Sequence, residues 1–76
     1  MKQIQPLEPF RPADLGVQST WGFIIQGVGT STLQIRIEGE WEDVRVFEEP
    51  DTYLDDMRRD ATYQFSAIDA DAVFII

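Results

Sequence analysis

The sequence contains no cysteine and no histidine, and Lys2 is its only lysine. Without cysteine, no disulfide can cross-link the fold. Without either residue, the common nucleophile–base pairs and the usual transition-metal ligands are also missing. None of the three serines lies in a Gly-x-Ser-x-Gly motif, and the aspartates lack the spacing of a calcium-binding loop. The sequence therefore predicts a non-enzymatic protein that needs no cofactor and no metal.

Positive charge and long apolar runs are also scarce. The chain has 14 acidic residues against six basic ones, which gives a formal net charge of −8. Because binding to a phosphate backbone requires a basic surface, we expect no nucleic-acid partner. No apolar run approaches the 18 or so residues that cross a bilayer, and residues 1–16 lack the apolar core of a signal peptide. We therefore expect synthesis in a host cytoplasm and no membrane partner.

The chain is also short. A 76-residue chain forms one domain and buries only about 60% of its unfolded surface. Small domains of this size often gain stability from disulfides, metals or association. Since the first two are not expected here, the sequence predicts a homo-oligomer, a multicopy assembly or docking onto a larger protein.

Three prolines spaced three apart, Pro6, Pro9 and Pro12, mark the start of the chain. This spacing favours the polyproline II conformation, which has three residues per turn. We therefore predict an extended arm over residues 1–16 and a folded domain over residues 17–76. Leu7 and Phe10 share one face of the arm, which either folds back on its own domain or contacts a neighbouring chain.

From residue 19 onward, short segments alternate between apolar and polar residues. The segments WGFIIQ, TLQIRIE and ATYQFSA show this period of two, and the final segment AVFII is apolar on both faces. Glycine and aspartate separate these segments, as expected for turns. The pattern predicts an all-β fold, a small antiparallel sandwich or barrel of five to six strands. It also predicts that the final strand is paired inside a sheet.

One hairpin register follows from matching residue types across the strands. A two-residue loop at Gly39-Glu40 places Ile35 opposite Val44 and Arg36 opposite Asp43. A loop at Glu38-Gly39 instead places Ile35 opposite Glu42, so the first register is predicted. It turns three residues of the second strand outward, namely Trp41, Arg45 and Phe47. The residues expected to contact a partner are therefore Leu7, Pro9, Phe10, Pro12, Trp41 and Phe47.

Residues 48–60 support two interpretations. Asp51 or Thr52 could cap a short helix with Asp55 and Asp56 in its first turn. Alternatively, residues 52–54 form a brief strand that a polar loop follows. The sequence does not separate these two possibilities.

The end of the chain, ATYQFSAIDADAVFII, combines a Tyr-x-Phe strand, a short acidic turn and an apolar final strand. Together with GTSTLQIRIEGEWEDVRVFEEPDTY, it resembles small β-domains of bacteriophage virions. This resemblance covers roughly residues 20–76. It implies a structural role in head decoration, cementing or a tail, with many copies that bind neighbouring subunits, and it implies no catalytic residues.

Two other functions remain open. A carbohydrate-binding module would need Trp41 and Phe47, or Trp21, exposed in one plane. An acidic inhibitor that mimics nucleic acid would need its carboxylates in phosphate-like rows. The acidic residues considered for such rows are Glu38, Glu40, Glu42, Asp43, Glu48 and Glu49.

Overall fold

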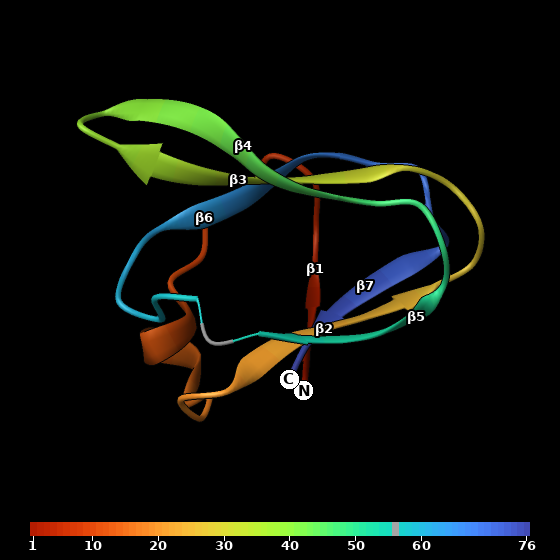
Figure 1. Cartoon of the computed structure of the whole chain (residues 1–76), viewed down its shortest axis with the longest axis horizontal. Helices are drawn as coiled ribbons and strands as arrows, with labels where there is room; N and C mark the ends of the chain where they lie inside the picture. Colours follow the sequence, from red (N-terminus) through yellow and green to blue (C-terminus); the bar gives the residue numbers. More distant parts are fainter. Residues whose placement is uncertain (56) are drawn as a thin grey trace.

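Two antiparallel sheets face each other across one core in the computed structural model, which describes residues 1–55 and 57–76. The four-stranded sheet has the order β1-β7-β2-β5, with strands β1 (Lys2–Ile4), β7 (Ala72–Ile75), β2 (Trp21–Gln26) and β5 (Asp51–Asp55). The three-stranded sheet has the order β4-β3-β6, with strands β4 (Glu40–Phe47), β3 (Ser31–Ile37) and β6 (Tyr63–Ile68). Figure 1 shows the two layers. The predicted all-β antiparallel class is confirmed, and of the two predicted architectures the structure is the sandwich, because the sheets do not close into a barrel. The predicted number of five to six strands is too low, since the described residues form seven.

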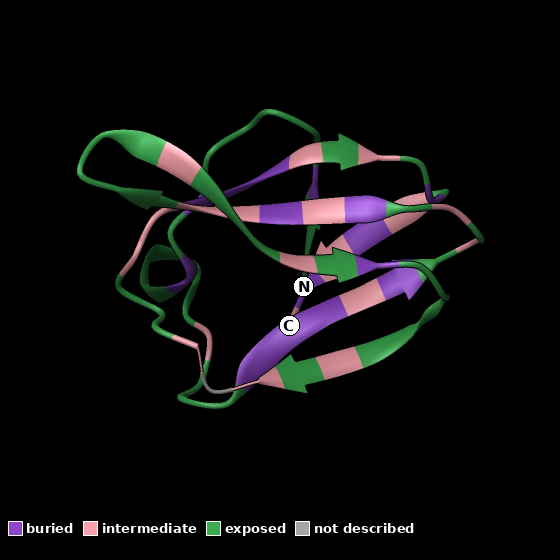
Figure 2. Cartoon of the chain, turned by 45° about the horizontal axis from the view of Figure 1, so that its top comes forward, coloured by how far each residue is buried: buried purple, intermediate pink, exposed green. Residues whose placement is uncertain are grey.

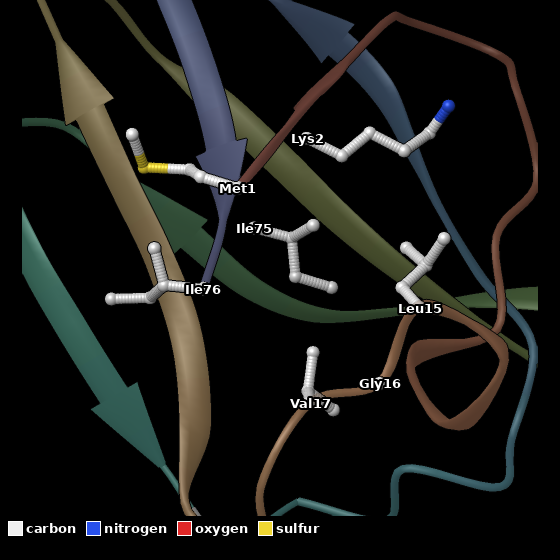
Figure 3. Close-up of a pocket in the computed structure, with 7 residues that line it drawn as sticks. All are labelled: Met1, Lys2, Leu15, Gly16, Val17, Ile75 and Ile76. Carbon is white, nitrogen blue, oxygen red and sulfur yellow. The ribbon is translucent and has the colours of Figure 1, made fainter.

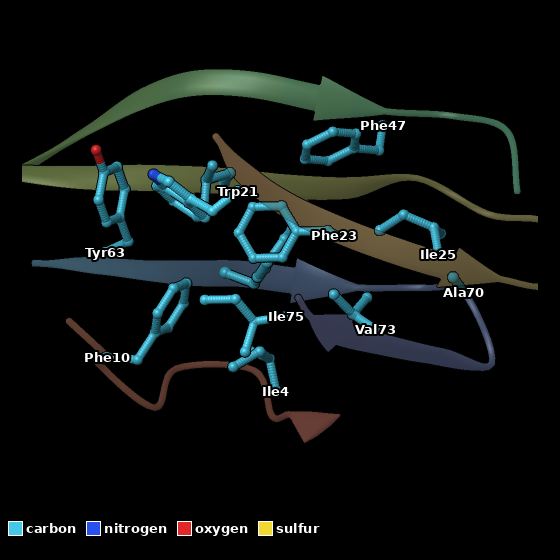
Figure 4. Packing of buried hydrophobic residues seen from close by; sticks show 12 residues of the cluster. Ile4, Phe10, Trp21, Phe23, Ile25, Phe47, Tyr63, Ala70, Val73 and Ile75 are labelled. Carbon is cyan, nitrogen blue, oxygen red and sulfur yellow. The ribbon is translucent and has the colours of Figure 1, made fainter. Parts of the chain in front are cut away.

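Aromatic side chains fill the space between the sheets (Figure 4). Trp21, Phe23 and Ile25, which alternation places on one face of β2, are all buried. The Phe23 ring meets the rings of Phe10, Trp21, Phe47 and Phe65 edge to face, at centroid distances between 5.1 and 6.0 Å. Edge-to-face pairs of this kind add to the stabilisation from apolar burial. One continuous aromatic core therefore supports both sheets.

The first sixteen residues lie against this core rather than away from it. β1 pairs with β7, and Phe10 forms an isolated bridge with Tyr63 at the edge of β6. Phe10 is buried, and Pro12 is buried at the start of the 3₁₀ turn η1 (Pro12–Leu15). The arm therefore docks on its own chain at these positions. The division of the chain into an arm over residues 1–16 and a folded domain over residues 17–76 stays a prediction.

The loop before β6 receives hydrogen bonds from several parts of the fold. Trp21 Nε1 donates to the Met57 carbonyl oxygen at 2.7 Å, and the Tyr63 hydroxyl donates to the Arg58 carbonyl oxygen at 2.6 Å. The Ala13 backbone amide donates to the Arg59 carbonyl oxygen at 2.7 Å. These bonds satisfy loop carbonyls next to the core and connect the N-terminal segment to the loop before β6.

The register predicted for the β3–β4 hairpin is wrong. The structure pairs Ile37 with Glu40 and Ile35 with Glu42, so the loop is Glu38-Gly39. Both loop residues have positive φ, +52° and +81°, as a type I′ turn requires. The hairpin tip projects past the sandwich and is largely exposed (Figures 1 and 2), so apolar matching there carries little energy. Turn geometry decides the register instead.

A β-bulge at Val44 changes the side of the sheet on which the end of β4 places its side chains. Gln34 pairs with Asp43, and Leu33 pairs with Arg45, which leaves Val44 as the extra residue of β4. The bulge turns Arg45 and Phe47 inward. The outward placement of Phe47 is therefore wrong; its side chain is only 2% exposed.

Residues 51–55 form strand β5, which settles the question that the sequence left open for residues 48–60 in favour of a strand. β5 pairs along β2 from Asp51 to Asp55. Asp56, expected in the first turn of the alternative helix, lies outside the described residues. The predicted pairing of the final strand is confirmed, because β7 lies between β1 and β2.

Candidate docking surface

The outer surface of the four-stranded sheet carries apolar side chains. One row of paired residues crosses all four strands, from Gln3 through Phe74 and Ile24 to Thr52. In the next row, Ile76 exchanges two backbone hydrogen bonds with Gly22, and Gly22 pairs with Leu54. Since directly paired residues share one face of a sheet, these residues form one surface. We call it the uncharged face; its members are Gln3, Gly22, Ile24, Gln26, Thr52, Leu54, Ala72, Phe74 and Ile76.

None of the residues of the uncharged face has an ionisable side chain, although charged residues make up 26% of the sequence. The charged residues of these strands, Lys2, Asp51 and Asp55, have the opposite parity and pair with Ile75, Ile25 and Trp21 on the inner side. Leu54 is 58% exposed, while Ile24 and Phe74 are half-buried. Antiparallel sheets commonly turn polar residues to solvent. This outer face instead combines apolar residues such as Ile24, Phe74 and Leu54 with uncharged polar ones such as Gln3 and Thr52, which makes it a candidate surface for association.

The outer surface of the three-stranded sheet is built differently. Gln64 Nε2 donates to Gln34 Oε1 at 2.8 Å, and Gln34 Nε2 donates to Asp43 Oδ1 at 2.8 Å. This row crosses all three strands, because Gln34 pairs with both Asp43 and Gln64. In the neighbouring row, the Arg36 guanidinium lies 5.7 Å from the centre of the Trp41 ring. We call this surface the polar face; its polar side chains bind one another, and it also carries the exposed Val46, which pairs with Thr32.

The side chain of Arg45 closes one open edge between the sheets. Its guanidinium lies 5.0 Å from the Phe47 ring centre and 5.2 Å from that of Tyr53, and its Nη1 lies 3.4 Å from Asp55 Oδ2. Cation–π contacts and an ion pair together hold β4 near β5. This arrangement leaves Arg45 facing neither outer surface.

Among the described residues in or next to the loop before β6, three groups have shifted pKa values, namely Arg58, Asp60 and Tyr63. Burial raises the pKa of the Tyr63 hydroxyl. The Arg58 guanidinium, whose Nε lies 3.1 Å from Asp60 Oδ1, lowers the pKa of that carboxyl group. The Arg58–Asp60 pair is exposed, so it indicates a surface ion pair rather than a catalytic group.

A cavity of about 350 Å³ lies between the two ends of the chain and residues 15–17 (Figure 3). Its walls are mostly apolar, and Ile75, which is only 2% exposed, contributes to them. Lys2 is the only ionisable side chain in its lining, and Lys2 Nζ lies 3.8 Å from Glu8 Oε1. The lining therefore contains no carboxylate or hydroxyl side chain for acid–base or nucleophilic chemistry.

The residues expected to contact a partner are divided by the structure. Phe10, Pro12 and Phe47 are buried within this chain, so their contacts are internal. Leu7 and Pro9 are exposed, with Leu7 67% exposed at a φ of +58°. Trp41 is half-buried and lies against Arg36 on the polar face. The six residues therefore do not form one surface.

Some of the residues named for the two alternative functions are buried or divided between faces. Trp21 and Phe47 are buried, so they offer no aromatic plane for a sugar. The hairpin carboxylates also divide between two faces: Glu40 and Glu42 pair with Ile37 and Ile35, whereas Asp43 lies on the polar face. Glu40, Glu42 and Asp43 therefore do not lie in one row.

No protein-family model, curated protein or solved structure matches this chain. In the described part of the chain, no group of three or more acidic side chains is placed to hold a metal ion. No helix among those residues is both long and apolar enough to span a bilayer. The resemblance to phage virion domains stays a hypothesis.

The sequence interpretation missed the uncharged face. Its signal was present in the runs FII and AVFII, where consecutive apolar residues supply both faces of a strand. A strand that is apolar on both faces is buried on one side by its own core and needs a cover on the other. The outward residues Ile24 and Phe74 come from these two runs.

Proposed function

We propose that this protein is a non-enzymatic structural component of a multicopy assembly, of the kind found in phage heads or tails, and that the uncharged face is its docking surface. The observation that supports the proposal is that the described residues of that face include no ionisable side chain, in a protein with a net charge of −8. Interface cores are depleted in charged residues in the same way.

The rest of the structure is suited to such a role. The sandwich provides a rigid body with one aromatic core, and the N-terminal segment is held by backbone hydrogen bonds at Leu7, Phe10 and Ala13. The polar face, whose side chains bind one another, remains compatible with solvent while the uncharged face contacts a neighbouring subunit. A rigid module that binds by one face needs little reorganisation on assembly.

The test is incorporation into particles. Particles released by cells that produce this chain should contain it in many copies when purified on a density gradient and quantified by mass spectrometry. Leu54→Asp, which places a charge on the uncharged face, should reduce incorporation, whereas Val46→Asp should not. Val46 is a matched control because it is 51% exposed, against 58% for Leu54, and also lies on an edge strand. Absence of the wild-type chain from purified particles would refute the proposal.

A further inference from the structure

We propose that the occupant of the uncharged face is the same face of a second copy, in a two-fold symmetric pair. This inference rests on the proposed function, since it names the neighbouring subunit. In such a pair, the four-stranded sheets pack against each other, with Ile24 and Phe74 at the centre and Leu54 toward one edge. Face-to-face sheet packing at about 10 Å is the ordinary geometry of such contacts.

Charge distribution favours a second copy over a partner of different chemistry. Two copies with a net charge of −8 repel each other through any acidic surface. Paired uncharged faces bring no like-charged side chains opposite each other. Asp51 and Asp55 of the four-stranded sheet lie on its inner side. The acidic residues of the polar face and hairpin belong to the far sheet, about 10 Å away. That distance exceeds the Debye length of about 8 Å at physiological ionic strength.

A basic partner would be attracted to the acidic β3–β4 hairpin rather than to the uncharged face. The projecting hairpin carries Glu38, Glu40 and Glu42, all exposed, whereas the uncharged face offers a cation no carboxylate side chain. Electrostatic complementarity sets the choice of partner and the register of docking. A face without ionisable side chains is complementary to a face of the same kind, and its own copy provides one.

The size of the face predicts a weak pair. Four strands about 4.8 Å apart and about five residues long give a surface of roughly 300 Å² per copy. The total of roughly 600 Å² is below the 1,200 Å² or so typical of stable complexes. A weak pair of this kind becomes strong in an array, where each copy is held close to its neighbours.

Sedimentation velocity over a concentration series of the full chain tests the inference. The wild-type protein should change from a monomer to a dimer as its concentration rises, with the gradual transition of a weak pair. Leu54→Asp should weaken the association at least about tenfold, because a carboxylate would lose water on pairing. Val46→Asp, which adds the same charge on the polar side, should dimerise like the wild type.

Three outcomes would overturn the inference: a wild-type monomer at every concentration, a larger species without a dimer, or equal weakening by both variants. Circular dichroism melts establish that both variants remain folded; if Leu54→Asp does not fold, Thr52→Asp replaces it. A monomeric wild type that still enters particles through the uncharged face would refute the two-fold pair alone. A dimer that never enters particles would refute the proposed function alone.

Discussion

The uncharged face and the polar face lie on opposite sides of one aromatic core, and antiparallel strands form both. On the polar face, Gln64, Gln34 and Asp43 hydrogen-bond across three strands. On the uncharged face, the corresponding row places Phe74 beside Ile24. Polar side chains that bind one another need no partner. Apolar side chains that are exposed to water raise the free energy of the protein, and a partner that covers them removes this cost. The two faces therefore differ in one respect: the side chains of the polar face find hydrogen-bond partners within the single chain, whereas the apolar side chains of the uncharged face are covered only by a partner.

The largest effect is expected from a change in the core that both faces share. Phe10→Ala should lower the free energy of unfolding by about 3–5 kcal/mol, because it leaves a cavity beside Phe23 and Tyr63. A 76-residue domain is stable by only about 4–11 kcal/mol, so this variant would be close to unfolding at room temperature.

Leu7→Ala is the matched control for Phe10→Ala in a urea titration. Leu7 lies in the same segment but is 67% exposed, so its truncation should change stability by less than about 0.5 kcal/mol. Equal effects of the two substitutions would show that Phe10 is not part of the core. Equal effects would also show that the N-terminal segment is an arm that does not pack against the core.

The next largest effect compares glutamines on the two faces. Gln34→Ala should cost about 1–3 kcal/mol, because the Gln64 amide, which is only 7% exposed, would lose its acceptor. Gln26→Ala on the uncharged face should cost less than about 0.5 kcal/mol, since Gln26 is exposed. Urea unfolding measures the free energy of unfolding of both variants, at one protein concentration that is low enough to keep the protein monomeric. A larger loss from Gln26→Ala would contradict the view that only the polar face is internally bonded.

The sequence predicted the strands and the inner layer well, because a period of two identifies buried residues wherever one face packs on a core. Trp21, Phe23 and Ile25 follow directly from this period. The hairpin register did not follow, because pair matching favoured Gly39-Glu40 while positive φ at Glu38 and Gly39 favoured the other turn. The bulge at Val44, which moved Phe47 into the core, has no comparable signal in the sequence.

The candidate docking surface was harder to predict than the core. Apolar residues such as Ile24 and Phe74 can be assigned to an outer face only after the partners of each strand are known. The pairing joins β1, β7, β2 and β5, which are distant in the chain. The proline spacing instead predicted partner contacts in the arm over residues 1–16. The structure uses Pro12 and Phe10 of that segment internally.

The smallest effect concerns one polar atom on the inner side of the three-stranded sheet. Ser31 is fully buried, and its hydroxyl has no hydrogen-bond partner within the described part of the chain. A buried hydroxyl without a partner loses its hydration without compensation. Ser31→Ala should therefore stabilise the protein by about 1 kcal/mol, which raises the melting temperature by roughly 4–8 °C in a domain of this size. Ser19→Ala, at an exposed position, serves as the control and should leave the melting temperature nearly unchanged. A lower melting temperature for Ser31→Ala would mean that the hydroxyl is satisfied in solution, and that the inner side of this sheet is less dry than its neighbours Phe47 and Ile68 indicate.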